Sequence, residues 1–162
     1  MHPDVAVDVL AIPLWINGRA FLTVTPAFGD VVSPRTGETL RRVPLCGADE
    51  VRLAIDSAQS VGAPWAVLTP GTRAAVLDAL GEALAGYAAH FAGMISEETG
   101  KADEAAEAEV SAAVALLRGG RDRSSPGVAA VLGRADEPLL GALRVAVPAL
   151  LAGATLVVCP PL

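Results

Sequence analysis

The sequence is poor in aromatic residues and cysteine, and it carries more acid than base. Aromatic side chains make up 4% of the 162 residues while 52% are hydrophobic, so a core must be built mainly from alanine, valine and leucine. Because only 19% of the residues are charged, an intrinsically disordered chain is excluded. The formal net charge of −6 argues against nucleic acid or an anionic membrane as a partner.

The two cysteines, Cys46 and Cys159, are too few for a disulfide framework, and their separation is not that of a metal site. No basic segment precedes an apolar one near Met1, so a signal peptide is not expected. The longest apolar run, 145–159, contains proline and glycine and is shorter than the roughly 18 residues of a membrane-spanning helix. We therefore expect a cytoplasmic protein without a metal.

The segment 127–162 has the pattern of a strand, a helix and a second strand. An apolar run at 128–132 bounded by glycines predicts a buried strand, and the β-branched run 155–159 predicts another. Pro138 fits the first turn of the intervening helix, and Gly153 fits its end. A strand–helix–strand of this length predicts the opening of a parallel sheet, with edges that require cover.

The first part of the chain predicts a β-hairpin, a second turn and three helices. Asn17-Gly18 accepts the positive φ angles of a tight hairpin turn between strands at 14–16 and 19–24. A turn at 33–37 is followed by a strand-like run at 38–45. The expected helices span 48–60, 69–99 and 102–118.

Capping residues and apolar spacing support these helices. Asp49 and Thr69 are the expected N-caps of the first two, and Gly100 is the expected left-handed C-cap of the second. The expected apolar faces contain Val51, Ile55 and Ala58 in the first helix, and Leu77, Leu80, Leu84, Phe91 and Ile95 in the second. The polar segment 121–126 predicts a boundary, which divides the chain into 1–120, a connector 121–126, and 127–162.

Several motifs occur in the order found in the NAD(P)-dependent aldehyde dehydrogenase superfamily, which the chain resembles over nearly its whole length. The motifs are Ile16-Asn17-Gly18, Ser33-Pro34-Arg35-Thr36-Gly37-Glu38, Trp65 with Pro70 to Arg73, Glu98-Thr99-Gly100-Lys101, 127–138 and 148–160. The resemblance implies an α/β fold: the N-terminal hairpin and helices of an aldehyde dehydrogenase, plus the first strand–helix–strand of its Rossmann-like parallel sheet.

The chain departs from the family pattern at two positions. The family's Pro-Trp-Asn-Phe-Pro motif supplies an asparagine amide N–H to the reaction's oxyanion, and the matching residue here is Asp136. An ionised carboxylate has no N–H to donate and repels negative charge. The family's lysine that contacts the cofactor ribose is matched by Cys159. We therefore expect no catalytic residue and no cofactor-binding residue at these positions.

The resemblance places the family's catalytic cysteine, its general-base glutamate and its glycine-rich turn beyond residue 162. The expected function is a non-catalytic accessory or interaction subunit of an oxidoreductase or related complex, inactive alone. The alternative is one half of a split NAD(P)-dependent aldehyde dehydrogenase, with the cofactor bound once another chain completes it. A third hypothesis is a relic fragment. In the first two, another protein chain, either an enzyme subunit or a second copy, covers the open sheet edge.

The other reactive side chains are expected to have structural or surface roles, without catalysis or metal binding. Cys159 lies in an apolar strand where burial would make a thiol inert, and Cys46 has no neighbouring base in the sequence, so neither is expected to be a nucleophile. His90 is expected to be a partly solvated helix residue, and adjacent Asp136 and Glu137 are expected to diverge in a polar loop. A solvated helix surface, rather than a metal or partner site, is expected for Glu97, Glu98, Asp103, Glu104, Glu107 and Glu109.

Overall fold

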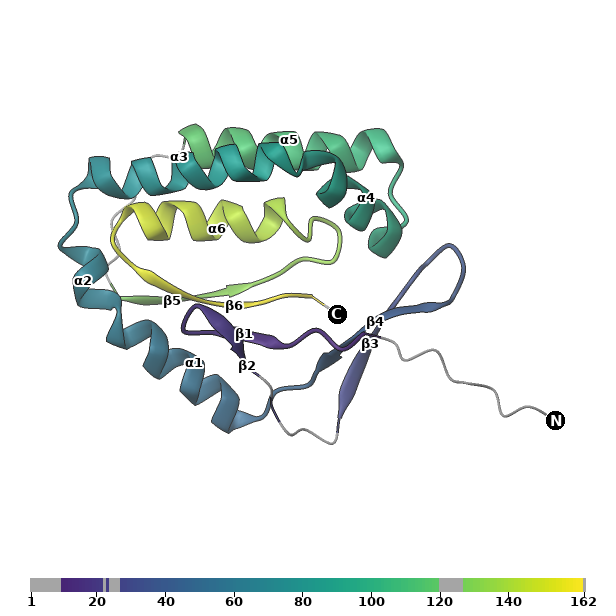
Figure 1. The fold of residues 1–162 in the computed structure, drawn as a ribbon, viewed down its shortest axis with the longest axis horizontal. Helices are drawn as coiled ribbons and strands as arrows, with labels where there is room; N and C mark the ends of the chain where they lie inside the picture. Colours follow the sequence, from purple (N-terminus) through teal and green to yellow (C-terminus); the bar gives the residue numbers. More distant parts are fainter. Residues whose placement is uncertain (1–9, 22, 24–26, 120–126, 162) are drawn as a thin grey trace.

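The computed structural model describes residues 10–21, 23, 27–119 and 127–161, which form an α/β fold in layers (Figure 1). Helices α3, α4 and α5 form the outer layer, α6 lies beneath them, and strands β5 and β6 separate α6 from α1. The elements are β1 (Leu14–Ile16), β2 (Arg19–Phe21), β3 (Phe28–Val32), β4 (Thr39–Pro44), α1 (Ala48–Ser60), α2 (Gly62–Ala66), α3 (Pro70–Gly86), α4 (Ala88–Thr99), α5 (Asp103–Gly119), β5 (Val128–Leu132), α6 (Leu140–Leu151) and β6 (Thr155–Cys159).

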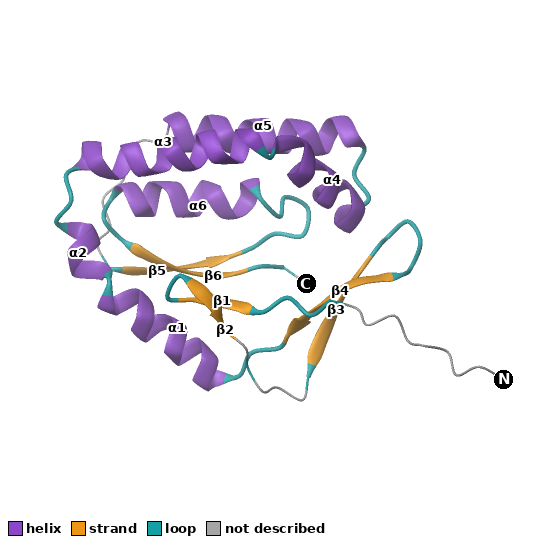
Figure 2. Ribbon diagram, in the orientation of Figure 1, coloured by secondary structure: helices purple, strands orange, loops and turns teal. Residues whose placement is uncertain are grey.

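Two antiparallel hairpins precede the helices (Figure 2). The β1–β2 hairpin confirms the sequence prediction, because Asn17 and Gly18 take φ angles of 54° and 70° at its turn. The turn at 33–37 is also confirmed, with the Gly37 N–H donating to the Ser33 carbonyl over 2.8 Å. Strand β3 was not predicted, because Gly29 and Asp30 interrupt its apolar residues.

Helix α1 begins as expected, but its cap and its packing differ from the prediction. Gly47 is the N-cap, and its N–H donates to the carboxylate of Glu50 over 2.9 Å, so the assignment of Asp49 as N-cap was wrong. Glu50 at the third helical position is half of a capping box, a signal present in the sequence. Of the expected apolar face, Ala58 is buried whereas Val51 and Ile55 are exposed.

The predicted second helix is two helices, α3 and α4, separated at Tyr87. The break follows Gly86, and glycine is among the weakest helix formers. The two ends are as predicted: the Thr69 side chain accepts from the Thr72 N–H over 3.2 Å, and Gly100 adopts a left-handed φ of 73°. On the predicted apolar face, Leu80 is exposed; short helix α2 was not predicted.

The strand–helix–strand prediction for 127–162 is confirmed by β5, α6 and β6. Strands β5 and β6 pair in parallel, from Val128 opposite Thr155 to Leu132 opposite Cys159. Gly153 follows the end of α6 with a φ of 91°. Pro138, in contrast, lies in the preceding turn rather than in the first turn of the helix, whose N-cap is Leu139. The predicted connector 121–126 lies outside the described residues.

The largest apolar cluster lies between the helical layer and α6, and it is built largely from aliphatic side chains. Ala106, Ala113 and Val147 are fully buried within it, so α5 and α6 approach through small residues. The cluster draws residues from both sides of the predicted boundary, and the division into three segments stays a prediction. In the described part of the chain, no helix is long and apolar enough to cross a membrane.

Candidate functional site

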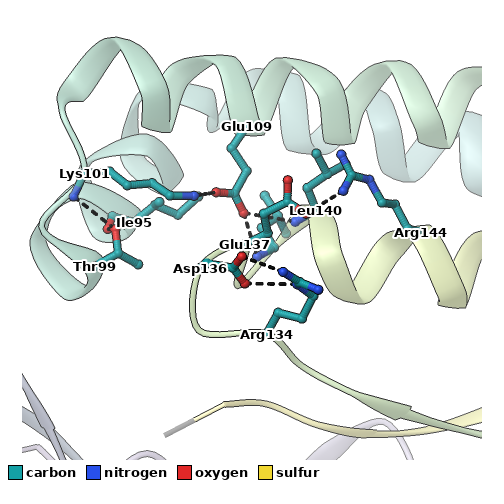
Figure 3. Close-up of polar contacts among 10 residues, drawn as sticks. Ile95, Thr99, Lys101, Glu109, Arg134, Asp136, Glu137, Leu140 and Arg144 are labelled. Carbon is teal, nitrogen blue, oxygen red and sulfur yellow. Dashed lines mark hydrogen bonds and ion pairs between the residues drawn. The ribbon is translucent and has the colours of Figure 1, made fainter.

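The turn between β5 and α6 contains the residue that matches the family's oxyanion asparagine. Arg134 and Glu137 bridge across the turn, which places Asp136 at its exposed tip (Figure 3). The Arg134 guanidinium donates to both carboxylate oxygens of Asp136, at 3.0 Å from Nε to Oδ1 and 2.6 Å from Nη2 to Oδ2. Asp136 therefore presents a carboxylate engaged in a bidentate ion pair, and no amide N–H.

The electrostatics of this pair keep Asp136 ionised. The hydrogen bonds from Arg134 lower the pKa of the Asp136 carboxyl below its ordinary value, and the positive charges of Arg134 and Lys101 lower it further. The same contact raises the pKa of Arg134. At neutral pH the tip of the turn thus carries an ionised carboxylate that is paired with a guanidinium.

Replacing Arg134 with glutamine should raise the pKa of Asp136 toward its ordinary value, because the bidentate donor and its charge are lost. In the wild type, the contribution of the pair to stability is complete above the unfolded-state pKa, and it disappears as pH falls through the depressed folded-state pKa. NMR titration of the Asp136 carboxyl carbon in both proteins measures this. An Arg52→Gln variant, which changes an exposed arginine on α1, should leave the titration unchanged, and equal pKa values in all three proteins would contradict the prediction.

A buried glutamate on α5 holds the turn and the start of α6 from behind. Glu109, whose side chain is 4% exposed, accepts hydrogen bonds from the backbone N–H groups of Leu139 at 3.0 Å and Leu140 at 3.1 Å. Its other carboxylate oxygen pairs with the ammonium of Lys101. The expectation of a solvated face was therefore wrong for Glu109. This carboxylate accepts from the N–H groups of the N-cap Leu139 and of the first helical residue Leu140, and its negative charge complements the start of α6.

The opposite end of α6 is held by a buried arginine and a tryptophan. Arg73 donates from Nε to the Leu151 carbonyl over 2.7 Å, and it also donates to the carbonyls of Ala66 and Leu68. The Trp65 indole N–H donates to the Leu150 carbonyl over 3.0 Å. Negative charge at the start of α6 and positive charge at its end both complement the helix dipole. Family motif residues Trp65, Arg73 and Lys101 thus hold this helix in place.

The other acidic residues are arranged as surface ion pairs or helix-end contacts. Arg41 pairs with Glu98 at 2.6 Å and Glu97 at 3.3 Å, and Asp103 accepts from the Ser96 hydroxyl over 2.6 Å. Glu104 and Glu107 are exposed, as expected. Within the described ranges, no group of three or more acidic, histidine or cysteine side chains could hold a metal ion.

Glu137 turns away from its neighbour Asp136, as the sequence predicted. Its carboxylate pairs with Arg144, one helical turn into α6, at 2.5 Å. The two adjacent carboxylates therefore do not form an acid–base pair. His90 lies exposed on α4 and packs edge-on to Phe91, with ring centroids 5.9 Å apart, which also agrees with the prediction.

The thiol at the family's ribose-lysine position is exposed. Cys159 ends β6, so the expectation that burial in the strand would make it inert was wrong. The sequence contains a signal for this exposure, because Cys159 is the last residue of its strand and fewer neighbouring residues cover the end of a strand. Cys46 is also exposed, on the loop before α1, and partial burial raises the pKa of its thiol, with further increases from Glu50 and Cys159.

The side chains at the carboxyl end of β6 do not fit the family's contact with a nicotinamide cofactor. Cys159 offers a thiol, which is uncharged when protonated and a weak hydrogen-bond donor, where the family's lysine offers an ammonium. Two shallow cavities occur elsewhere. One, of about 330 Å³, lies between the β1–β2 hairpin and α1, and the other, of about 340 Å³, lies between the turn at 33–37 and α4. Neither cavity is lined by Asp136 or Cys159.

Comparison with known proteins identifies the fold. Residues 24–120 match the model of the aldehyde dehydrogenase family, which is more than half of the chain. The chain belongs to the aldehyde dehydrogenase family. Among curated aldehyde dehydrogenases, lactaldehyde dehydrogenase from Escherichia coli K12 is 32% identical over 99 residues, covering 61% of this chain and 21% of the relative. Malonate-semialdehyde dehydrogenase from Pseudomonas aeruginosa is 35% identical over 94 residues, covering 58% of this chain and 17% of the relative.

Solved structures extend the similarity to the strand–helix–strand unit. An NADP-dependent enzyme of E. coli superposes with a TM-score of 0.84 at 28% identity, covering 94% of this chain and 36% of that structure. The E. coli lactaldehyde dehydrogenase structure gives 0.83 at 26% identity, with the same shares covered. The chain thus spans about a fifth of the length of these curated relatives and about a third of these aldehyde dehydrogenase structures.

Proposed function

We propose that this chain is an aldehyde dehydrogenase-like accessory or interaction subunit that does not perform the family's chemistry at its own oxyanion position. One observation carries the proposal. The contacts that position the β5–α6 turn are in place at both ends of α6, while the tip of that turn presents Asp136 locked to Arg134. The scaffold is maintained without the donor that the chemistry requires.

The expected loss of reaction rate follows from the missing donor and the negative charge of Asp136. Removing one oxyanion donor lowers the rate by about 100- to 1000-fold in known hydrolases. Asp136 adds repulsion to that loss, because its depressed pKa keeps it ionised when an oxyanion would develop beside it. Cys159 removes a positive charge from the position that resembles the ribose contact. Both changes lie within the chain itself and hold whatever other polypeptide surrounds it.

A turnover assay tests the proposal directly. The protein is incubated with NAD or NADP and a panel of aldehydes, and formation of the reduced nicotinamide is followed by absorbance. We expect no turnover above the protein-free rate. Turnover that disappears in an Asp136→Ala variant would overturn the proposal, because it would show that the carboxylate takes part in the reaction.

The second candidate is half of a split NAD(P)-dependent enzyme completed by another chain. It is favoured by the coverage, since the solved relatives that match 94% of this chain are nearly three times longer. Mixing this chain with a chain that supplies the rest of the fold separates the two candidates. The accessory hypothesis expects no turnover for the mixture with wild-type chain and recovery with an Asp136→Asn, Cys159→Lys double variant. Turnover with the wild-type chain supports the split enzyme.

The partner that we propose covers the edge of the β5–β6 sheet. In the part of the chain that the structure describes, β5 and β6 pair only with each other, and Leu132 at the end of β5 is 76% exposed. Parallel sheets are normally buried and have covered edges. An enzyme subunit or a second copy of this chain would provide that cover.

Leu132→Lys should abolish capture of such a partner, because it places a charge at an exposed apolar position at the end of β5, where the partner would pack. The tagged chain is used to capture partners from its native cell, and the captured proteins are compared by mass spectrometry. Val67→Lys is the matched control, because Val67 is a similarly exposed apolar residue at the end of α2, outside strands β5 and β6. Equal capture by both variants would contradict the proposed surface.

A further inference from the structure

The turn at 33–37, which joins β3 to β4, is attached to the helical layer by the side chain of Arg35. Its guanidinium donates through Nη2 to the Ser96 hydroxyl over 3.0 Å, to the Gly100 carbonyl over 3.4 Å and to the Lys101 carbonyl. Ser96 is itself buried on α4, so one of these contacts reaches below the surface. The loop between α4 and α5 is therefore held by a residue of the hairpin.

The same turn packs closely on the end of α4. Gly100 has a left-handed φ of 73°, and a Cβ added to it would lie only 2.9 Å from Cγ of Pro34. Glycine satisfies both the backbone conformation and the lack of space. The turn and the loop thus meet in a close contact that leaves little freedom for one to move without the other.

The backbone of Lys101 is held from both sides. Its N–H donates to the Thr99 hydroxyl over 3.2 Å, while its carbonyl accepts from Arg35 and, over 2.9 Å, from the Ser96 hydroxyl. These contacts fix the direction in which the Lys101 side chain leaves the backbone. A long side chain that starts from a fixed point loses less conformational entropy when it reaches its partner.

The side chain of Lys101 continues the series of contacts to the β5–α6 turn (Figure 3). Its ammonium pairs with the buried carboxylate of Glu109, which accepts from the N–H groups of Leu139 at 3.0 Å and Leu140 at 3.1 Å. A buried carboxylate depends strongly on its cation, because an unpaired charge in the interior is costly. A displacement of Lys101 should therefore be felt at these two N–H groups.

We propose that Arg35 is a positioning residue for the β5–α6 turn, which it reaches through the backbone of Lys101 and the carboxylate of Glu109. The turn at 33–37 and the β5–α6 turn then form a coupled pair, in which the order of each depends on the other. Such coupling is a free energy that acts in both directions. The inference rests on the proposed function for the importance of the β5–α6 turn, but it is measured by amide exchange rather than by turnover.

Arg35→Met should accelerate hydrogen exchange at the amides of Leu139 and Leu140 by about fivefold, the lower end of the coupling found between sites in proteins. Exchange is followed residue by residue by NMR on the whole folded protein. The rate at Val147, inside α6, separates local opening of the turn from global unfolding. Unchanged rates at both amides would overturn the proposal.

A double variant tests whether the effect passes through the ion pair. Glu109→Gln removes the charge that pairs with Lys101 but keeps an acceptor for the backbone N–H groups. In this background, Arg35→Met should change exchange at Leu139 and Leu140 by no more than about twofold, which is the ordinary error of additivity between independent sites. Equal acceleration in both backgrounds would contradict the proposed route.

Arg41→Met is the matched control for the loss of a hairpin arginine. Arg41 on β4 also joins the hairpin to α4, through ion pairs with Glu97 at 3.3 Å and Glu98 at 2.6 Å. These contacts do not include Lys101, so exchange at the two amides of the β5–α6 turn should match the wild type. The same acceleration in Arg41→Met and Arg35→Met would show that any loosening of the hairpin has this effect, and it would overturn the specific role of Arg35.

The reverse measurement keeps the test decisive if Arg35→Met does not fold. Glu109→Gln should accelerate exchange in the turn at 33–37, at the N–H of Ser33, which donates to the Glu38 carbonyl over 2.9 Å, and at the N–H of Gly37. Unchanged exchange at both would refute the coupling. Neither result alters the turnover assay, so failure of this proposal and failure of the proposed function are distinguishable.

Discussion

Replacing Glu109 with alanine should destabilise the protein by about 3 kcal/mol, which is the cost of breaking a buried ion pair by removing one partner. The substitution leaves the N–H groups of Leu139 and Leu140 without their acceptor and removes the charge that faces Lys101. A buried donor without a partner is itself costly. The loss should appear as a lower urea midpoint at an unchanged denaturant slope.

Two companion variants make the result specific. Glu107→Ala changes the same residue type on an exposed position of α5, and it should shift the unfolding free energy by no more than about 0.5 kcal/mol. Glu109→Gln keeps an acceptor for the two backbone N–H groups, so hydrogen exchange at Leu139 and Leu140 should remain slower than in Glu109→Ala. Identical stability of Glu109→Ala and Glu107→Ala would show that the buried carboxylate does not hold the turn.

Arg73→Met should have a comparable effect, about 3 kcal/mol, at the other end of α6. The guanidinium is buried and donates to three carbonyls, those of Ala66, Leu68 and Leu151. Methionine fills much of the space but donates nothing, so these acceptors lose their partner. Urea unfolding measures the change.

Arg73→Lys should recover little of this loss, because an ammonium cannot reproduce the planar fork of a guanidinium. Arg52→Met on α1 is the matched control: its side chain is 71% exposed, and its ion pair with Asp49 is a surface one, so the expected change is below about 0.5 kcal/mol. Full stability of Arg73→Lys would mean that charge alone, rather than the arrangement of donors, secures the end of α6.

The parts of the fold that the sequence predicted are those with local signals. Asn17-Gly18 determines its turn by backbone geometry, Thr69 caps the helix that follows it, and the runs at 128–132 and 155–159 have the composition of buried parallel strands. Each of these features depends on residues a few positions apart. The family motifs added the arrangement of these elements, which local signals do not contain.

The sequence predictions were wrong where contacts between residues far apart in the chain determine the local structure. Pro138 lies in the turn before α6, and the N–H groups of the two residues that follow it donate to Glu109, some thirty residues earlier. The same contact buries a glutamate that appeared to belong to a solvated acidic face. Cys159 was expected to be buried because its strand is apolar, yet it stands at the strand's exposed end. In the site, the identity of Asp136 was evident from alignment with the motif, whereas its ion pair with Arg134 required the structure.

Glu109 contacts the β5–α6 segment through the main-chain nitrogens of Leu139 and Leu140, and this contact bears on which substitutions the turn can tolerate during evolution. Hydrogen bonds to the backbone do not depend on which side chains occupy 135–137. Substitutions can therefore accumulate at those positions while the turn keeps its position. The same freedom works in reverse. A protein engineer could restore an amide at the tip, or install another functional group there, without rebuilding the support beneath it.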